Sequence, residues 1–438
     1  MKIRKIIIVF LSFYINSVTA QKIVTVSEAI ELALENNYGI KIISNTKKIA
    51  KNNASILNSG YLPTVTSSSG ATFNKDNIEA EFANGESTQL NGAKSSRYNA
   101  SINLNYTLFD GLGRYYNYKR LKETYKLSEL QARETIENTI AQLYAVYYNV
   151  AQVSESVDVL ERTLAISKDR IKRANYQFEY GQGTMLDVLN AQVDVNNDSI
   201  NLINAKQQLV NTKRDLNVVL GNVITSEFNV ETSIDFKLDV DQNDLINKMK
   251  SNNVTLLQLD KNMMINEFII KANKSGYLPS IGLTGAYGWN KGNNNAASFV
   301  AVSTNTGLSG GLNLSWNLFD GGSTATRVNN AKIDLENKAL EKESMMIDIE
   351  RNFNNAWDDY QNKLQVYGVQ EDNIKTAKNN FDRTKEKFKL GQVTSIEFRQ
   401  AQLNLLSAEL RTSQAKYDAK IAEILVLQIS GELLNVEF

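Results

Sequence analysis

The sequence predicts a membrane α+β fold in which one structural unit is built twice. Three observations predict it: short motifs recur at a constant spacing, long polar stretches carry a seven-residue apolar repeat, and short segments alternate apolar with small polar residues. We expect a first unit over residues 21–221, a linker over 222–242 and a second unit over 243–438. The linker stretch SIDFKLDV is expected to add a short strand or a contact at mid-length.

The constant spacing identifies an internal duplication. NYTLFDG ends at Gly111 and SWNLFDG ends at Gly321, 210 residues later. The stretch YGQGTMLDVLNAQ over residues 180–192 recurs as LGQVTSIEFRQAQ over residues 390–402, at the same offset. Both copies place a Gly-Gln pair and a threonine inside a helical pattern, which predicts a turn between two helices.

The composition excludes several kinds of chemistry. The chain has 48 basic and 48 acidic residues and no net charge, so nothing favours nucleic acid as a partner. It has no cysteine and no histidine, which removes disulfides, thiolate metal sites, cysteine nucleophiles and the commonest general base. Paired carboxylates remain available, but the acids are spread along helical faces. We therefore expect neither an enzyme nor a cofactor.

Residues 1–20 have the pattern of a secretory signal peptide. Basic residues precede an apolar core over residues 6–15, and small residues lead to Ala20. The alternative is an uncleaved anchor, but the core is shorter than the ~20 residues that a spanning helix needs. We therefore expect export. Since no later segment is apolar enough to cross a membrane as a helix, a membrane span must use strands.

The seven-residue repeat predicts two long helical hairpins, at about 112–220 and 322–430. Apolar residues fall seven apart in the second hairpin, and the first hairpin repeats this phase. These positions are Tyr360, Tyr367, Ile374, Phe381 and Phe388, and Val150, Val157, Leu164, Ile171 and Phe178. The first helix of each hairpin would run ~100 Å, at about 1.5 Å per residue. The second helix is about half as long. Two shorter helices stacked end to end should therefore line the long first helix.

Four segments predict antiparallel strands, at about 63–75, 98–109, 279–290 and 307–319. Apolar residues alternate with uncharged Asn, Ser and Thr, which suits a sheet with lipid on one face and water on the other. The clearest lipid-facing positions are Ile102, Leu104, Tyr106, Leu108, Leu312, Leu314, Trp316 and Leu318. The alternative is a soluble sheet with one buried face. It is disfavoured because the helices already use their apolar stripe in a coiled coil.

The number of predicted strands points to an oligomer. Four strands are too few to close a barrel, because the smallest barrels have about eight. Strand edges left unpaired in lipid are prohibitive. Closure therefore requires more than one chain, with about eight strands in a dimer and about twelve in a trimer.

The junctions between strands and helices also recur. SGYLP ends at Pro63 and again at Pro279, and proline is tolerated at the start of a strand. Asp110 and Asp320 precede the long helices and are predicted to cap their N-termini. A catalytic role for these aspartates is the alternative, and capping explains their position more simply.

These features together resemble the TolC-like family of outer membrane efflux proteins. The resemblance rests on the signal peptide, the duplicated unit, the paired YLP and LFDG junctions, and the paired Gly-x-x-Thr turns followed by an acid. It implies a homotrimer with a twelve-stranded barrel in the outer membrane of a Gram-negative bacterium, continued by a helical tunnel in the periplasm. It also implies a passive exit duct of a tripartite efflux pump or type I secretion system, opened by a periplasmic adaptor and an inner-membrane transporter.

The resemblance further implies where the adaptor would bind. In the family, the hairpin turns at the periplasmic end of the tunnel meet the adaptor. The corresponding residues are Gly181, Gln182 and Thr184 in the first unit and Gly391, Gln392 and Thr394 in the second.

The resemblance implies a constriction next to these turns. Well-studied members narrow the tunnel with two aspartates three residues apart in the second hairpin. The corresponding positions are Glu397 and Gln400, with Asp187 and Asn190 in the first unit, so one acid per unit remains. An arginine that latches the closed state in such members corresponds to Val393. These acids also have a structural explanation, because an acid in the first turn stabilises a helix N-terminus.

Two other classes of protein fit part of the pattern. Heptads alone suit a structural or adhesive coiled-coil protein of the cell surface, but such a protein leaves the four amphipathic strands unexplained. A periplasmic adaptor needs one coiled-coil hairpin rather than two. The exit duct is therefore the leading hypothesis.

Overall fold

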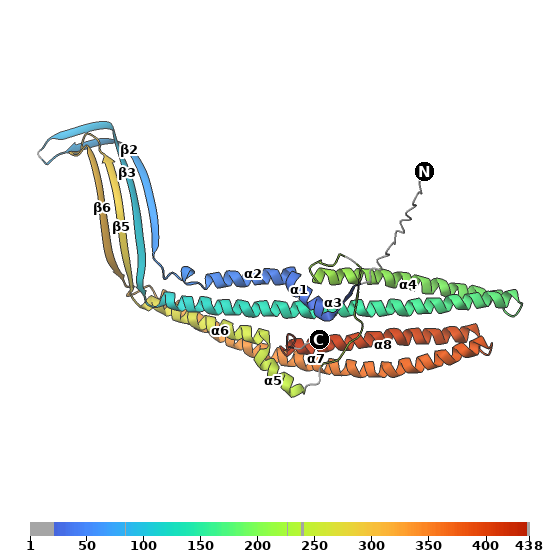
Figure 1. Ribbon diagram of the computed structural model, residues 1–438. Helices are drawn as coiled ribbons and strands as arrows, with labels where there is room; N and C mark the ends of the chain where they lie inside the picture. The colour runs from blue at the N-terminus through green and yellow to red at the C-terminus, as the bar shows by residue number, and fades with distance from the viewer. Residues whose placement is uncertain (1–21, 84, 226, 238–240, 436–438) are drawn as a thin grey trace, which may run out of the picture.

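A computed structural model describes residues 22–435, apart from 84, 226 and 238–240. The predicted signal peptide lies outside the described residues. The chain has the shape of a bent arm (Figure 1): long helices lie side by side in an elongated body, and four strands rise from one end of it. Among the described residues, no helix is both long enough and apolar enough to cross a membrane.

The helical body contains the same set of helices twice. The first unit has α1 (Val26–Asn36), α2 (Tyr38–Asn53), α3 (Gly113–Glu179) and α4 (Met185–Val219), and the second has α5 (Gln242–Asn252), α6 (Val254–Asn273), α7 (Ser323–Lys389) and α8 (Ser395–Ile429). The long helices α3 and α7 both have 67 residues, and α4 and α8 both have 35. The duplication therefore preserves the length of the hairpin helices to the residue, whereas α2 has 16 residues and α6 has 20.

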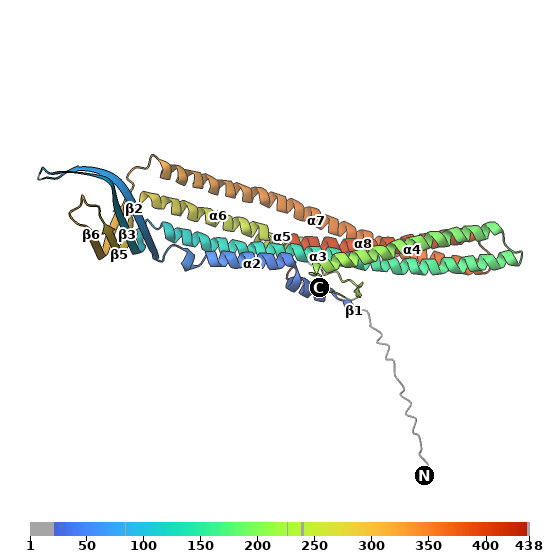
Figure 2. The same cartoon turned by 90° about the horizontal axis from the view of Figure 1, so that it is seen from above.

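The helices form one curved layer in which α3 is central and α7 lies at an edge. Near the strands the order is α2, α3, α6, α7, and Figure 2 shows it from above. Toward the hairpin turns the order becomes α4, α3, α8, α7. Each long helix is thus lined by two shorter ones placed end to end, α2 and α4 beside α3, and α6 and α8 beside α7.

The strands form one antiparallel sheet in the order β2, β3, β5, β6. They are β2 (Thr64–Glu81), β3 (Ser87–Asp110), β5 (Ser280–Asn293) and β6 (Val302–Ser315). Pro63 and Pro279 directly precede β2 and β5. The β2–β3 hairpin is longer than predicted, because pairing continues as far as Glu81↔Ser87. Most of the polar stretch between the two predicted strands is therefore also strand.

The predicted end of the fourth strand is wrong. β6 ends at Ser315, whose partner Ser280 is the first residue of β5, so the chain beyond it has no strand to pair with. In the first unit the equivalent stretch stays in β3 because it pairs with β5, as far as Asp110↔Ser280. Trp316 and Leu318 therefore lie past the strand, and the Trp316 indole donates to a backbone carbonyl 3.1 Å away.

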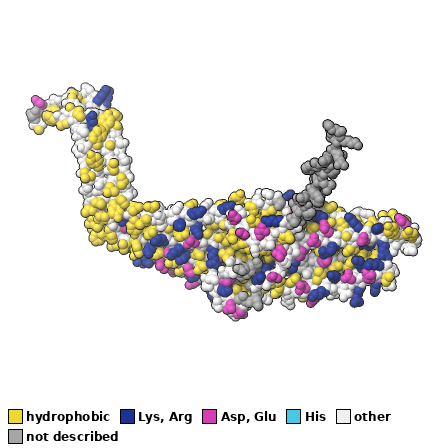
Figure 3. Space-filling model, in the orientation of Figure 1, with side chains coloured by type: hydrophobic (Ala, Val, Ile, Leu, Met, Phe, Trp, Pro, Cys, Tyr) yellow, Lys and Arg dark blue, Asp and Glu magenta, His cyan; other side chains and the backbone are white. Residues whose placement is uncertain are grey.

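Apart from Asp110 at the end of β3, the charged residues of the sheet lie far from the helices. Residues 64–74, 98–109, 280–290 and 302–315 contain none. In Figure 3 the charged side chains of the four-stranded sheet lie near the end farthest from the helices. Hydrophobic side chains cover much of the rest of its visible face. Ile102, Leu108, Leu312 and Leu314 are all exposed. An apolar belt of this extent indicates contact with lipid or with another chain.

The linker ties the two units together at mid-length. Strand β4 (Phe228–Val230) pairs in parallel with β1 (Lys22–Val24). The Tyr147 hydroxyl, on α3, donates to the Val24 carbonyl at 2.7 Å and accepts the N–H of Glu231 at 3.0 Å. The short strand thus lies at 228–230, ahead of the SIDFKLDV stretch.

The described part of SIDFKLDV is held on α8 by hydrogen bonds. Lys420 donates to the Asp235 carbonyl at 2.6 Å, and the backbone N–H of Lys237 donates to the buried carboxylate of Glu423. The linker therefore crosses from the first unit onto a helix of the second and makes the expected contact there.

The two junction aspartates cap the long helices from slightly outside them. Asp110 Oδ2 accepts the backbone N–H of Arg114 at 2.9 Å, and Asp320 Oδ2 accepts that of Thr324 at 2.8 Å. The residues at the N-cap positions themselves are Leu112 and Gly322, both with positive φ. The capping role is as predicted, but the aspartates lie two residues before the cap.

Candidate functional site: the hairpin turns and the seam behind them

The two hairpin turns have the same backbone conformation. Gly181 and Gly391 have φ of +70° and +71°. In each turn the next N–H, of Gln182 or Gln392, donates back to the helix it has just left, at 2.7 Å and 2.9 Å. The left-handed conformation costs other residues about 1–2 kcal/mol. The repeated glycine is therefore explained by the turn itself.

The helix after each turn begins with a capping box. Asp187 accepts the N–H of Thr184 at 3.1 Å and returns its own N–H to the threonine hydroxyl at 3.2 Å. Glu397 and Thr394 repeat this pair, at 2.7 Å and 3.2 Å. Hydrogen bonds from the Thr184 hydroxyl and backbone lower the pKa of Asp187, and those from the Thr394 backbone and hydroxyl lower the pKa of Glu397. Both acids thus have a structural task.

The constriction residues predicted from the resemblance lie on the first two turns of α4 and α8. Asp187 is half-buried, whereas Asn190, Glu397 and Gln400 are exposed in the single chain. The Gln400 amide donates to Asn404 at 2.9 Å. A ring of these side chains needs several copies of the chain, so the constriction stays a prediction.

The sequence did not reveal a buried ionic cluster just behind the turns. Arg399 on α8 donates two hydrogen bonds to the carboxylate of Asp198 on α4, at 2.7 Å and 2.8 Å. Asp198 also accepts from Ser167 on α3 at 2.6 Å, and both residues are almost completely buried. Burial works against the charge of Arg399, but the hydrogen bond and charge of Asp198 raise its pKa. The cluster joins the second hairpin to both helices of the first.

A second arginine strengthens this link. Arg170 on α3 is buried, pairs with Asp194 on α4, and donates to the Ser395 carbonyl at the start of α8. The Nε atoms of Arg170 and Arg399 are buried without a hydrogen-bond partner among the described residues. The two hairpins are therefore fixed to each other by charged groups held out of water.

Gln402 also crosses this seam. Its amide, almost completely buried, donates to the Thr163 carbonyl and to the Ser167 hydroxyl, both at 3.0 Å. Its counterpart in the repeat, Gln192, is exposed and donates to Asn196 in its own helix. The repeated Ala-Gln pair in the sequence was the available signal for this contact.

A cleft of about 350 Å³ opens between the hairpins near the turns. Phe388 and Phe398 stack in it with ring centres 4.6 Å apart, and the Arg173 guanidinium lies 5.3 Å from the Phe388 ring. The cleft is also lined by Asp169, Lys172, Tyr176, Lys385 and Lys389. It combines an aromatic floor with a basic rim, and the sequence patterns gave no sign of it.

The described residues contain no cluster of three or more acidic side chains placed to hold a metal ion. The acids near the turns are instead used in caps and ion pairs. Nothing in this arrangement joins a nucleophile to a base.

Comparison with known proteins identifies the family. The family model described as outer membrane efflux protein matches residues 29–222 and 245–432, one match for each unit. The efflux protein BepC of Brucella suis is 22% identical over 416 residues, which cover 93% of this chain and 86% of BepC. The TolC protein of Vibrio cholerae is 21% identical over 375 residues, 84% of each chain.

Solved structures agree on the fold. The CmeC outer membrane channel of Campylobacter jejuni superimposes with a TM-score of 0.73 at 17% identity, over 93% of this chain and 86% of CmeC. The open MtrE channel of Neisseria gonorrhoeae gives a TM-score of 0.71 at 17% identity, over 93% of this chain and 89% of MtrE. The predicted resemblance is confirmed: the chain belongs to the outer membrane efflux protein family, as a non-enzymatic outer membrane channel whose long helices form its periplasmic extension.

Proposed function

We propose that three copies of this chain form a passive exit duct. The duct receives a periplasmic adaptor at its hairpin turns and, through the adaptor, an inner-membrane transporter that supplies the energy. Twelve strands, four from each chain, form the barrel in the outer membrane, and the helices form the tunnel. Either a tripartite efflux pump or a type I secretion system provides such partners.

The observation that carries this proposal is that a single chain leaves both edges open. The sheet ends in β2 on one side and β6 on the other, with no further strand among the described residues. The helical layer likewise ends in α7 on one side and in α2 and α4 on the other. Unpaired edges cannot remain in lipid, so the layer has to close on further copies of itself.

The adaptor would meet the turns at Gly181, Gln182 and Thr184 and at Gly391, Gln392 and Thr394. The basic, aromatic cleft beside these turns favours an adaptor whose tip carries carboxylates next to an apolar side chain. Electrostatic complementarity of this kind raises the association rate and selects the partner. Reversing the charge at Lys172 and Lys385, which line the cleft, should weaken adaptor binding in a pull-down at low salt.

The constriction can be tested through its charge. Asp187 and Glu397, with Asn190 and Gln400 beside them, would face the narrowest part of the duct. Glu397→Gln removes one negative charge per chain, while glutamine still supports a capping box. We expect the reversal potential in a salt gradient across a planar bilayer to shift toward weaker cation selectivity. Glu386→Gln, at an exposed acid paired with Lys389, is the matched control. Unchanged selectivity and conductance for Glu397→Gln would remove the constriction role.

Fractionation and crosslinking test the duct itself. An outer membrane location with a crosslinked trimer is the expected result. A soluble periplasmic monomer would contradict the duct, and a surface-exposed fibrous coiled coil would favour a structural or adhesive role.

A further inference from the structure

A hollow of about 470 Å³ lies near the end of the sheet that is farthest from the helices. β5 ends at Asn293, opposite Ser96, whereas β2 and β3 continue to pair beyond this point. The hollow occupies the corner where β5 leaves the longer hairpin. It is lined by Phe73, Asn74, Lys75, Lys94, Ser95, Ser96 and Asn293. The described residues that line it thus include two lysines and no acid.

The hollow is on the apolar face of the sheet. Successive side chains of a strand point to opposite faces, so Lys94 shares a face of β3 with Tyr98 and Ile102. Lys75 is paired with Lys94 and lies on the same face. The Phe73 ring meets the Tyr98 ring edge-on, with ring centres 5.7 Å apart. Figure 3 shows basic side chains at this end of the sheet, next to the hydrophobic cover.

Lys291 on β5 brings a third positive charge to this face. It is paired with Tyr98, and all three lysines are exposed. Within the described part of the chain, none of the three has an ion pair or a side-chain hydrogen bond. Asp76 follows Lys75 directly, and the alternation of the strand places it on the opposite face.

The register of the hairpin favours an anion between two of these lysines. Lys75 and Lys94 are directly opposite each other, where Cβ atoms are about 4.5–5.5 Å apart and like charges destabilise a sheet. An anion between the two ammonium groups would replace this repulsion by charge-assisted hydrogen bonds. The Ser96 hydroxyl accepts from the Asn293 amide at 2.9 Å and can donate its own proton to the same anion. A phosphate has both the charge and the acceptor oxygens for these donors.

The height of the lysines points to a lipid as the source of this phosphate. The long helices form the periplasmic extension, so the far end of the sheet is at the outer leaflet (Figure 1). From Leu108 to Tyr98 the strand rises ~34 Å, or ~26 Å along the membrane normal at a tilt of about 40°, which matches the apolar band of a membrane barrel. Tyr98 and Trp289 thus lie at the boundary where aromatic side chains gather, and Lys94 lies beyond it at the level of the headgroups.

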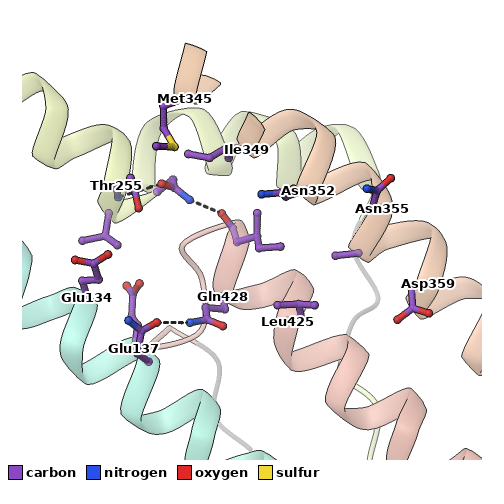
Figure 4. A pocket seen from close by; sticks show the side chains of 15 residues that line it. Glu134, Glu137, Thr255, Met345, Ile349, Asn352, Asn355, Asp359, Leu425 and Gln428 are labelled. Carbon is purple, nitrogen blue, oxygen red and sulfur yellow. Dashed lines mark hydrogen bonds between the residues drawn. The ribbon is translucent and has the colours of Figure 1, made fainter. Parts of the chain in front are cut away.

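A larger cavity, of about 670 Å³, lies at mid-length between α3, α6, α7 and α8 (Figure 4) and has the opposite character. It is lined by the carboxylates of Glu134, Glu137 and Asp359 and by no basic residue of the described chain. These carboxylates are already held by a neighbouring amide, arginine and lysine. The lysines at the far end of the sheet have no such partners, so they are the groups that await a ligand.

We propose that Lys75 and Lys94, with Lys291 beside them, bind the phosphate of a phosphorylated lipid in the outer leaflet. The acyl chains of this lipid lie along the apolar face of the sheet, below Phe73 and Tyr98. The proposal rests on the proposed barrel, which places this face in lipid, and it adds a specific lipid contact to the duct.

Lipid A carrying both phosphates is the probe for this site. The full-length chain, purified from outer membranes in detergent, would be titrated with a fluorescent form of it. We expect Lys94→Gln to weaken binding about 5-fold, and Lys75→Gln together with Lys94→Gln to weaken it about 30-fold, at about 1 kcal/mol for each lysine. Arg97→Gln is the matched control, because Arg97 is three residues away on the same strand and on the opposite, polar face. This variant should bind lipid A as the parent does.

Varying the ligand in the same assay identifies the group that is bound. Lipid A without its phosphates should bind the parent as weakly as intact lipid A binds the double variant. Inorganic phosphate at millimolar concentration should not displace intact lipid A from the parent. Displacement by inorganic phosphate would show a site for free anions and overturn the lipid assignment.

Thermal unfolding provides a second readout. Without lipid, the double variant should be at least as stable as the parent, because the repulsion between Lys75 and Lys94 is gone. Lipid A should raise the unfolding temperature of the parent and of Arg97→Gln, but much less that of the double variant. A double variant that is less stable without lipid would show that the lysines serve the sheet itself, which would contradict the site.

The outcomes separate this site from the proposed duct. Equal binding of lipid A by the parent, Lys94→Gln and Arg97→Gln, or an equal loss in both variants, would overturn the site and leave an outer membrane trimer standing. A parent chain recovered as a soluble periplasmic monomer would overturn the duct, and the lipid site with it.

Discussion

The two long helices α3 and α7 descend from one sequence, have 67 residues each, and lie in different surroundings. Twenty residues of α3 are buried but only eight of α7. α3 has neighbours on both sides, whereas α7 has α6 and α8 on one side and an open edge on the other. Place in the layer, rather than ancestry, therefore decides how much of each helix is buried.

The difference extends to chemistry. α3 buries charged and polar residues, among them Glu123, Glu137 and Arg170. At the matching positions α7 carries Ile333, Ile347 and Asn380. Within the chain the two units are thus joined by specific polar pairs in addition to the apolar contacts between α3 and α8. Variants that place a residue of one unit at the matching position of the other test how far each helix depends on its surroundings.

The largest loss of unfolding free energy is expected when the buried pair Arg399–Asp198 is broken. Arg399→Leu, which installs the counterpart Leu189, strands a buried carboxylate and should cost about 3–5 kcal/mol of unfolding free energy. Adding Asp198→Ala, after its counterpart Ala408, should recover most of this, because apolar replacement of a whole buried pair is often neutral. Urea unfolding of the purified protein in detergent measures both.

The control for this prediction is an exposed pair at the same seam. Arg162 and Glu409 are 3.1 Å apart, and the arginine side chain is largely in solvent. Arg162→Leu should cost about 0–1 kcal/mol. A double variant as unstable as Arg399→Leu alone would show that the pair is not simply exchangeable with its counterpart.

A somewhat smaller loss of unfolding free energy, equal in both units, is expected when the glycines that follow the shorter hairpin helices are replaced. A Cβ on Gly221 would lie 2.6 Å from the Asn36 carbonyl oxygen, and one on Gly431 would lie 2.6 Å from that of Asn252. Each alanine variant should lose about 2–4 kcal/mol, from the positive φ together with overpacking. Gly181→Ala, with positive φ but open space, should lose only about 1–2 kcal/mol. Unequal losses at 221 and 431 would mean that the units differ here, against expectation.

Removing a capping box should cost less stability, and the cost should again be the same in both units. Thr184→Ala and Thr394→Ala each remove an N-cap side chain and should cost about 1 kcal/mol. The cost should be local, so amide hydrogen exchange at the start of α4 or α8 is the measurement. Faster exchange spread along the whole helix would contradict a local capping role.

The smallest expected effect is a loss of local stability at the hairpin turns at acidic pH. Asp187 and Glu397 have pKa values lowered by their caps, so their stabilisation is present above the ordinary pKa of each group. It is lost as the pH falls through the lowered value. Exchange at the turns should therefore accelerate below about pH 4. Asp187→Asn should remove the acceleration at the first turn and leave it at the second.

Much of the fold followed from local sequence. The hairpins, their turns at Gly181 and Gly391 and the doubling of the unit all depend on periodicity and on short motifs. The length of the β2–β3 hairpin did not, because residues 74–95 are mostly polar and those that pair in the sheet pair with each other. The end of β6 did not either, since it depends on a missing neighbour rather than on residues 316–319 themselves.

The seam behind the turns was hidden for a different reason. Arg399 and Asp198 lie 201 residues apart, and neither belongs to the apolar repeat from which the helices were predicted. Polar residues on a heptad helix are expected on its solvated face. Only the recurrence of Gln192 as Gln402 hinted that a polar residue was buried there.

The equal lengths of the hairpin helices in the two units limit how the helical body can change. One extra residue in α3 would rotate everything beyond it by about 100° and move the turn by ~1.5 Å, which would disturb the match to α4 and to the second unit at once. The strands carry no such constraint, and the repeat offset changes from 216 to 210 across them. Insertions and deletions are therefore tolerated in the four-stranded sheet. The helical body can change only by substitution, or by matched insertions in all the helices that lie side by side at that level.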